Sequence, residues 1–364
     1  MENLKTHKTI TLVLTNRNRD LCIVKNCLNS IENQINQDFN CILVDYGSDE
    51  VYVNELQEVL AEHSKINFIS CKVSGQLWNK CRAINIALKT CETPYFLVGD
   101  IDLLFHPEFV NIATSLAKPN EVHYFQYGFI SQNESLLNKK FEDYIVEFKG
   151  TNEVTGTTLF PTRVLKQLNG YDEFYHGWGA EDTDIHIRMK NEGLPVYFYD
   201  KEILLKHQWH PKAYRSKSST HPFHSQLERV NHAYMLNTEQ TSRKQVNKFT
   251  EWGKIPDANA YQKFSKPSHR LYLKASNLQL KAFLAQLDNF ENETLQLTLT
   301  DFSVLVKAKN NIKKILGKKT IPILDLESIN NLILEDIIKK HRNKPYNYSF
   351  NRKTKTIVLT MYCE

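Results

Sequence analysis

Long apolar runs are absent from this sequence. No stretch approaches the roughly 18 consecutive apolar residues that a membrane-spanning helix requires. The apolar stretch near the N-terminus, Ile10 to Leu14, is too short for a signal peptide and runs directly into Asn16-Arg17-Asn18-Arg19. We therefore expect a cytoplasmic protein that carries no export signal.

Paired metal-binding cysteines are also missing. The seven cysteines are an odd number, and no two of them form a CxxC pair. In a protein without an export signal we expect reduced thiols rather than a disulfide framework. The same spacing speaks against a structural zinc site.

The sequence has no basic motif with interleaved aromatic residues, so we do not expect nucleic acid as a partner. The net charge of +5 is nevertheless uneven, since residues 301–364 carry 13 Lys/Arg and 6 Asp/Glu. That tail has a charge of +7, and the remainder of the chain has −2. Two interpretations remain open: a solvated basic surface, or contact with an anionic partner such as a membrane surface or a phosphate-linked acceptor.

The first 110 residues alternate between strand-like and helix-like patterns. This alternation predicts an α/β fold with a mostly parallel, doubly wound sheet and helices on both faces. Ligands of such sheets bind beyond the carboxyl ends of the strands, so the polar residues found there are candidates for a site. The strand-like runs are Thr9–Thr15, Asn40–Asp45, Ile66–Ser70 and Tyr95–Val98, and the helical runs are Asp20–Gln34, Val51–Ser64 and Trp78–Thr90.

Composition divides the chain into three parts. We expect a catalytic domain at 1–215, a polar loop, lid and linker at 216–267, and a basic C-terminal α+β accessory region at 268–364. The accessory region is predicted to hold a helix over Leu271–Leu287 and a hairpin of Tyr346–Phe350 with Ile357–Tyr362.

Asp100-Ile101-Asp102 directly follows an apolar strand. Carboxylates at positions i and i+2 point the same way, and carboxylate and phosphate oxygens are ligands that Mg²⁺ or Mn²⁺ prefers. Aspartates are also common in loops without any metal. The position after a strand of an α/β unit favours the metal interpretation.

A second motif is His176-Gly-Trp-Gly-Ala-Glu-Asp-Thr-Asp184. Its glycines free the backbone beside Trp178, whose indole face offers a stacking surface for a sugar. Glu181 and Asp182 then open a helix, where acidic residues are favoured by the helix dipole. The alternative is a simple helix cap by Asp182 or Thr183, although a cap does not require Gly-Trp-Gly in front of it.

A third candidate is His207-Gln208-Trp209-His210. Imidazole is a frequent ligand of transition metals, but nothing local indicates which histidine binds.

Together these motifs resemble those of family-2-type glycosyltransferases of the GT-A fold. The shared opening is Thr15-Asn16-Arg17 and Val44-Asp45-Tyr46-Gly47-Ser48, and Arg82-Ala83-Ile84-Asn85 before Asp100 also fits. The segments Gly170–Glu173 and Gly177–Asp182 are similar to those of β-1,4-galactosyltransferases and the bacterial chondroitin-polymerase group. His207, which follows Glu181 by 26 residues, matches the histidine that completes the metal site in that group. The resemblance covers about residues 8–215.

The resemblance implies a Rossmann-like GT-A domain that moves a hexose or N-acetylhexosamine from a UDP-sugar to a hydroxyl of a glycan, lipid-linked or protein acceptor, with inversion. Mn²⁺ (or Mg²⁺) would bind at Asp102 and His207, with His210 as the other candidate ligand. The implied roles are general base for Asp182, with Glu181 beside it, and acceptor or sugar contact for Trp178 and Gly179. The implied nucleotide-sugar contacts are Thr15, Asn16, Arg17, Asp45, Arg82, Asp100 and Ile101.

Two other functions remain open at this point. One is a nucleotidyltransferase or similar nucleotide-diphosphate enzyme, against which the Gly-Trp-Gly-Ala-Glu-Asp motif speaks. The other is a non-catalytic sugar-binding protein, against which the intact Asp102, Asp182 and His207 speak. Through its basic tail the enzyme is expected to contact the inner face of the membrane peripherally.

Overall fold

The computed structural model describes residues 8–211, 217 and 221–363. The chain divides into two compact units. The first comprises Met1–Cys71, Asn79–Lys212 and Glu228–Ile255, and the second comprises Lys72–Trp78, Ala213–Leu227 and Pro256–Glu364. These units differ from the expected boundaries at 215 and 267, because each unit includes segments from distant parts of the chain. The stretch expected to be loop and linker contains a 14-residue helix, α8 (Leu227–Gln240).

The first unit is built on a seven-stranded mixed sheet of order β10-β6-β9-β4-β1-β2-β3. Strands β1 to β4 are parallel to one another, as expected, whereas β9 runs antiparallel to both of its neighbours. The strands are β1 (Ile10–Asn16), β2 (Phe39–Tyr46), β3 (Ile66–Cys71), β4 (Tyr95–Asp100), β6 (Val122–Phe125), β9 (Thr158–Pro161) and β10 (Val196–Tyr199).

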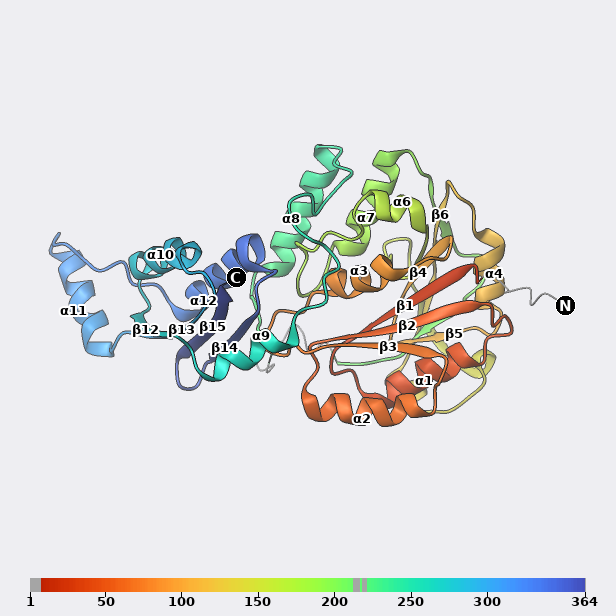
Figure 1. The fold of residues 1–364 in the computed structure, drawn as a ribbon, viewed down its shortest axis with the longest axis horizontal. Helices are drawn as coiled ribbons and strands as arrows, with labels where there is room; N and C mark the ends of the chain where they lie inside the picture. The colour runs from red at the N-terminus through yellow and green to blue at the C-terminus, as the bar shows by residue number, and fades with distance from the viewer. Residues whose placement is uncertain (1–7, 212–216, 218–220, 364) are drawn as a thin grey trace. The chain divides into compact units, whose positions relative to one another are not determined.

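Helices cover both faces of this sheet, which confirms the predicted α/β class. Figure 1 shows α1 and α2 on one side of the strands and α3 and α6 on the other. Helix α1 begins where the side chain of Asp20 accepts a hydrogen bond from the Cys22 amide, and its apolar stripe turns toward the sheet. The helices of this unit are α1 (Leu21–Glu32), α2 (Glu50–Ala61), α3 (Lys80–Thr90), α4 (Phe109–Leu116), α5 (Gln132–Ser135), α6 (Thr162–Gln167), α7 (Glu181–Glu192) and most of α8.

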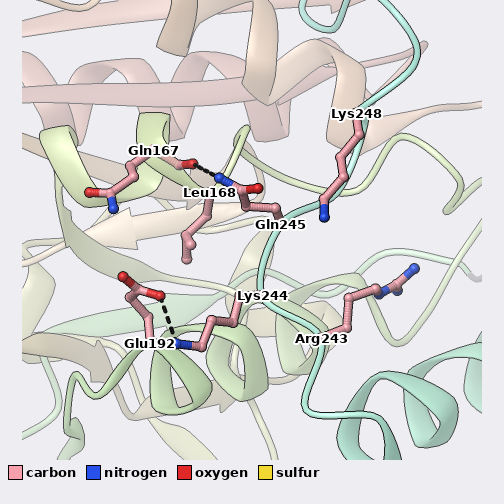
Figure 2. A pocket seen from close by; sticks show the side chains of 7 residues that line it. All are labelled: Gln167, Leu168, Glu192, Arg243, Lys244, Gln245 and Lys248. Atoms are coloured by element: carbon pink, nitrogen blue, oxygen red, sulfur yellow. Dashed lines mark hydrogen bonds and ion pairs between the residues drawn. The ribbon is translucent and has the colours of Figure 1, made fainter.

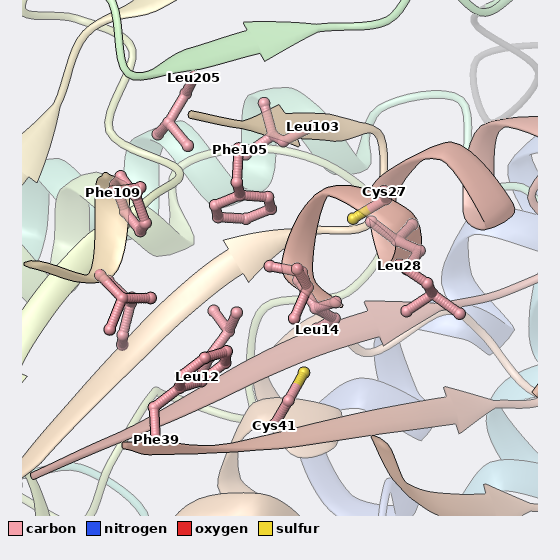
Figure 3. Close-up of a cluster of buried hydrophobic side chains, with 14 of the residues drawn as sticks. Leu12, Leu14, Cys27, Leu28, Phe39, Cys41, Leu103, Phe105, Phe109 and Leu205 are labelled. Carbon is pink, nitrogen blue, oxygen red and sulfur yellow. The ribbon is translucent and has the colours of Figure 1, made fainter. Parts of the chain in front are cut away.

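The main hydrophobic core lies on the face of the sheet that α1 covers (Figure 3). Leu12 and Leu14 of β1 are fully buried there, and Phe105 and Phe109 meet edge to face with ring centroids 5.2 Å apart. Burial of each such side chain contributes about 1.5–3 kcal/mol. Cys41 is a core residue too, and burial raises the pKa of its thiol to about 12. All seven cysteines are free thiols, as expected.

A second, four-stranded sheet of order β5-β11-β7-β8 extends the carboxyl-end side of β4. Strand β5 follows β4 after a two-residue turn and pairs antiparallel with β11, so that Leu103 lies opposite His207. Through this pairing, Asp102 of the Asp-x-Asp motif lies beside His207, although more than a hundred residues separate them in the sequence. The strands are β5 (Leu103–Phe105), β7 (Tyr127–Ile130), β8 (Val146–Lys149) and β11 (Leu205–His207).

The second unit is a separate α+β body around the sheet β12-β13-β15-β14. Its β14–β15 pair is the predicted hairpin, and residues 72–78 join the unit because the Tyr348 amide donates to the Gly75 carbonyl at 2.9 Å. The elements are β12 (His269–Lys274), β13 (Glu293–Thr300), β14 (Tyr346–Asn351), β15 (Thr356–Cys363), α9 (Ala258–Gln262), α10 (Asn277–Gln286), α11 (Val304–Ile315) and α12 (Leu326–Asp336).

The helix predicted over Leu271–Leu287 is wrong in its first part. Residues His269–Lys274 form strand β12, which pairs in parallel with β13, and the helix α10 starts only at Asn277. Leu271 and Leu273 alternate at the strand period of two, and pairing with the distant β13 stabilises the strand. Within the described part of the chain, every helix is too short or too polar to span a bilayer.

Candidate active site

Asp102, His207 and His210 come together at the junction of the two sheets of the first unit. One ligand atom from each lies within 4.8 Å of those of the other two. Asp102 occupies the turn between β4 and β5, and His207 is the last residue of β11. Among the described residues, this is the one group of three or more His, Cys, Asp or Glu side chains arranged to hold a metal ion.

Asp102 is a buried carboxylate beside one guanidinium group and two imidazole rings. Its Oδ2 lies 3.0 Å from the Arg19 guanidinium and 3.1 Å from His210 Nε2, and its Oδ1 lies 3.6 Å from His207 Nε2. Burial alone raises the pKa of Asp102, but His207, His210 and Arg19 outweigh it and hold that pKa below its ordinary value. Oδ1 is buried without a hydrogen-bond partner among the described residues, so this oxygen has a coordination position to offer.

Neighbouring groups orient the two histidine rings. His210 Nδ1 lies 3.2 Å from the Pro211 carbonyl, which leaves its Nε2 facing Asp102. Burial lowers the pKa of His207, although Asp102 acts in the opposite direction. The His207 ring packs against Phe129 with centroids 5.0 Å apart. A neutral imidazole whose ring is fixed by its neighbours is the form that binds metal ions.

Gln208 fixes the end of β11. Its side chain is fully buried, donates to the Ile23 carbonyl at 3.1 Å, and accepts from Asn26 at 3.1 Å. Its backbone amide donates to the Asp102 carbonyl at 2.9 Å. These bonds join the histidine segment to α1 and to the Asp-x-Asp turn, so the metal candidates are positioned by buried contacts on both sides.

A second cluster gathers three carboxylates around one ammonium group. Lys80 Nζ, at the start of α3, lies 3.1 Å from Asp100 Oδ1, 3.1 Å from Asp182 Oδ2 and 3.6 Å from Glu181 Oε1. Burial lowers the pKa of Lys80, but the three carboxylates outweigh it and raise that pKa well above its ordinary value. Lys80 therefore stays charged, and it connects the Asp-x-Asp motif to the acidic start of α7.

The pKa of Asp182, one carboxylate of this cluster, is strongly shifted by its surroundings. Burial is the main cause that raises its pKa well above the ordinary range; Lys80 lowers it, whereas Glu181 and Asp100 raise it further. Its Oδ1 is buried without a hydrogen-bond partner among the described residues. A raised pKa makes a carboxylate a stronger proton acceptor than an ordinary one, and the unused oxygen leaves a position for the proton.

The segment before α7 has a backbone that only a few residue types adopt readily. Gly177, Gly179 and Ala180 all have positive φ, at 74°, 96° and 69°. Ala180 occupies the N-cap position of α7, and no side chain caps the helix. Asp182 therefore does not act as the cap, which was the alternative interpretation of this motif; its side chain is bound to Lys80 instead.

Trp178 lies in this strained segment with 46% of its surface exposed. The Asn231 side chain of α8 donates to the carbonyls of His176, Trp178 and Gly179 at 2.9–3.4 Å. A segment that the sequence assigns to a lid or linker thus holds the Gly-Trp-Gly backbone in place.

Residues outside the sequence motifs contact Asp100 and limit the space around it. The Tyr127 hydroxyl lies 3.1 Å from Asp100 Oδ2 and 2.7 Å from the Thr157 hydroxyl. A Cβ added at Gly156 would lie 2.6 Å from the same Asp100 oxygen. Glycine is therefore required there unless the site shifts.

The predicted nucleotide contacts at the ends of β1 and β2 lie side by side. Asn16 donates to Asp45 Oδ2 at 2.7 Å, and the Ser48 hydroxyl donates to the same oxygen at 2.6 Å. Burial raises the pKa of Asp45, and the bonds from Ser48 and Asn16 oppose that shift. Thr15, the residue before Asn16, is buried. Arg17, the residue after Asn16, is half-buried, and its charge also lowers the pKa of Asp45.

The side chains of two other predicted nucleotide contacts, Arg82 and Ile101, lie inside the first unit. Arg82 is buried in α3 and pairs with the fully buried Glu173 at 2.8 Å, so it is held inside the unit by an ion pair. The Ile101 side chain is part of the hydrophobic core, which leaves only its backbone to face the site. The sequence pattern alone does not distinguish these inward positions from Asp100 and Asp102.

A surface pocket of about 360 Å³ also lies in the first unit, beside the ends of α6 and α7 (Figure 2). None of the predicted site residues lines it, and its Glu192–Lys244 ion pair of 3.2 Å is solvent-facing. The lining residues are Gln167, Leu168, Glu192, Arg243, Lys244, Gln245 and Lys248.

The sequence interpretation misses three residues of the site: Lys80, Arg19 and Tyr127. Arg19 lies in the Asn16-Arg17-Asn18-Arg19 run, so the basic pair after β1 is the signal that could have found it. Lys80 and Tyr127 enter through the packing of α3 and β7, and no local motif marks them.

Two family models match this chain. "Glycosyl transferase family 2" matches residues 11–168, and a model described as "N-terminal domain of galactosyltransferase" matches residues 137–210. The first covers the strand-end residues and the Asp-x-Asp turn, and the second covers the Gly-Trp-Gly-Ala-Glu-Asp segment and both histidines. These matches favour the glycosyltransferase interpretation over the nucleotidyltransferase and the non-catalytic binding protein.

Similarity to individual proteins is more limited. A teichoic acid poly(glycerol phosphate) polymerase of Staphylococcus epidermidis is 36% identical over 94 residues, which is 26% of this chain and 12% of the polymerase. A crystal structure of GalNAc-T7 with UDP, GalNAc and Mn²⁺ has a TM-score of 0.43 and 11% identity, over 56% of this chain and 43% of that one. The assignment does not depend on that structural likeness. On the two family matches, which together span residues 11–210, the chain is a glycosyltransferase whose catalytic unit resembles the family-2 type.

Proposed function

We propose that this enzyme transfers a hexose or N-acetylhexosamine from a UDP-sugar to an acceptor hydroxyl, with the help of Mn²⁺ and with inversion at the anomeric carbon. The observation that carries the proposal is the meeting of two clusters: a metal-ligand group at Asp102, His207 and His210, and a carboxylate group around Lys80. Asp100 belongs to the second cluster and is two residues from Asp102.

Asp102, His207 and His210 would hold the ion. The donor set of one carboxylate and two imidazoles suits Mn²⁺ better than Mg²⁺, which prefers oxygen ligands throughout. The buried, unused Oδ1 of Asp102 supports the fit. When bound, the ion supplies positive charge that neutralises the departing nucleoside diphosphate.

Asp182 is the proposed general base. In the reaction the acceptor oxygen bonds to the anomeric carbon, the bond from that carbon to the diphosphate oxygen breaks, and the hydroxyl proton passes to Asp182. The raised pKa of Asp182 and its unused Oδ1 support this role. Lys80 would keep the carboxylate oriented, and Glu181 would hold a sugar hydroxyl.

The nucleotide is proposed to bind at the carboxyl ends of β1, β2 and β4. Thr15, Asn16, Arg17 and Asp45 would face the base and ribose, together with Asp100 and the Ile101 backbone. Arg82 would act indirectly, because its guanidinium is paired with Glu173 inside the unit. Trp178 and Gly179 would form the platform for the sugar or the acceptor.

The acceptor is proposed to be part of an anionic cell-surface polysaccharide. The relative matched over 94 residues is a polymerase of poly(glycerol phosphate), which is compatible with a phosphate-linked acceptor. We further propose that the second unit is an accessory body that brings the enzyme to such an acceptor or to the inner face of a membrane. The excess of +7 in residues 301–364 motivates this part of the proposal.

Release of nucleoside diphosphate from a panel of nucleotide sugars tests the proposed reaction. We expect slow, Mn²⁺-dependent release of UDP from one UDP-sugar without acceptor, and faster release with the correct acceptor. EDTA should abolish both. Metal-independent release, or release of another nucleotide in place of UDP, would contradict the proposed donor chemistry.

A further inference from the structure

Helix α11 (Val304–Ile315) turns its apolar face away from the protein. None of its residues is buried. At 3.6 residues per turn, its apolar positions other than the half-buried Val306 fall within about one third of the circumference, a continuous stripe along the helix. These residues, with their exposed fractions, are Val304 at 81%, Leu305 at 74%, Ile312 at 56%, Ile315 at 84% and the C-cap residue Leu316 at 60%, with Ala308 also exposed between them.

The opposite face of α11 attaches the helix to its own unit by polar contacts. The Asn310 side chain donates to the Ile321 carbonyl at 2.9 Å and accepts from the Ile321 amide at 2.8 Å. Lys307 pairs with Asp301 at 2.6 Å. A helix of a water-soluble body normally buries its apolar stripe and exposes its polar face, and α11 has the reverse orientation.

The charges around this stripe have one sign. Residues 302–324 contain six lysines and no aspartate or glutamate. Lys309 and Lys313 lie along one border of the apolar stripe, and Lys318 and Lys319 follow the end of the helix. Long lysine side chains can lay their methylene stems along an apolar surface while the ammonium groups reach outward to anionic groups.

We propose that α11 is an interfacial helix that inserts its apolar stripe into the surface of an anionic lipid bilayer. An exposed apolar stripe bordered by lysines is the pattern of helices that lie in the plane of a membrane interface. A second copy of the chain fits less well, because pairing two such faces would bring two sets of lysines together. The proposal concerns the second unit only and does not depend on the proposed glycosyl transfer.

Vesicle flotation of the full chain tests it. We expect the protein to float with vesicles of phosphatidylcholine containing phosphatidylglycerol at low salt, and to bind pure phosphatidylcholine vesicles much more weakly. The Leu305→Ser/Ile312→Ser variant should lose at least about tenfold in apparent affinity, since it removes much of the inserting apolar area. The Lys309→Glu/Lys313→Glu variant should lose affinity for the anionic vesicles selectively.

Matched controls separate position from composition. Phe249→Ser removes an exposed apolar side chain of the first unit, and Lys281→Glu/Lys353→Glu changes two exposed lysines of the second unit. Both controls should float like the wild type. Because α11 has no buried residues, the melting temperature of the two α11 variants should stay close to that of the wild type.

Two results would overturn the proposal. One is wild-type protein that ignores anionic vesicles, or α11 variants that float as the wild type does. The other is a wild-type oligomer in light scattering that the Leu305→Ser/Ile312→Ser variant dissociates, which would assign the stripe to a second copy of the chain.

Discussion

Lys80 Nζ lies 3.1 Å from Asp182 Oδ2, although 102 residues separate the two in the sequence. The same ammonium group is 3.1 Å from Asp100, so one cation bridges the Asp-x-Asp motif and the start of α7. The contact orients the proposed base and sets its protonation, because Lys80 is the main group that lowers the pKa of Asp182 against burial.

Replacing Lys80 with methionine should move the acid limb of the pH–rate profile to higher pH. Without the ammonium group, burial, Glu181 and Asp100 all raise the pKa of Asp182, so a larger fraction of the base is protonated at a given pH. The measurement is the transfer rate from pH 5 to 9. Lys80→Arg, which keeps the charge, should keep the acid limb near its wild-type position. An unchanged acid limb in Lys80→Met would show that Lys80 does not tune the base.

Asp182→Asn should lose acceptor transfer by about 10²–10⁴-fold, because general-base assistance is typically worth that much. Binding of the nucleotide–metal complex should stay nearly normal, and the melting temperature should change little, since Ala180 rather than Asp182 holds the N-cap position of α7. Turnover and melting temperature are measured on the same preparation. Glu181→Gln is the matched control, and it should lose less turnover. Wild-type turnover in Asp182→Asn would eliminate Asp182 as the base.

His207→Ala should lose at least about tenfold more activity than His210→Ala, a difference within the range seen when groups that support a metal site are removed. His207 ends strand β11, whose pairing with β5 fixes it beside Asp102, whereas His210 lies three residues beyond that strand. Activity measured across a Mn²⁺ titration distinguishes the two variants. The reverse order of losses would make His210 the principal ligand.

The buried His186 should make the protein less stable in mild acid. Burial lowers the pKa of His186 to about 3, and its Nε2 lies 2.9 Å from the Thr158 hydroxyl. The folded state keeps this ring neutral, whereas the unfolded chain protonates it below about pH 6.5. Stability is therefore fully present above that pH and falls as the pH drops toward 3, by about 2 kcal/mol between pH 6.5 and 5 from this group.

His186→Gln tests that assignment in urea unfolding at pH 7 and pH 5. The variant should start less stable at pH 7 but should lose about 2 kcal/mol less than the wild type on acidification. An identical pH dependence in both proteins would show that other groups control the acid response.

Much of the sheet and part of the site follow from local patterns. The four parallel strands are rich in apolar residues, and the aspartates at the end of β4 necessarily lie at the carboxyl ends of these strands. The hairpin of β14 and β15 is equally local, because two strand-like runs flank a short polar turn. Asp102 and His207 could be paired only through the family resemblance, since their contact arises from the β5–β11 ladder.

The remaining features of the site and fold depend on contacts between residues that are far apart in the sequence. Lys80 and Tyr127 reach the carboxylates through tertiary packing, and Arg82 is drawn inward by Glu173. Residues 72–78 join the second unit because Tyr346 and Tyr348 bond to them. The orientation of α11 could not be predicted either. The spacing of apolar residues predicts an apolar stripe on the helix but does not tell whether the stripe faces the protein or the solvent.

Mn²⁺-dependent binding of UDP to wild type and to Asp102→Asn, measured by titration calorimetry, is the most direct test of the central claim that Asp102 belongs to a metal site that holds the donor. The substitution keeps the size of the side chain and removes the charge that faces His207, His210 and Arg19. The account predicts that the wild type binds UDP only with Mn²⁺, and that Asp102→Asn loses this affinity by more than about tenfold with an unchanged melting temperature. UDP affinity that is equal in both proteins, or equal with Mn²⁺ and with EDTA, would contradict it.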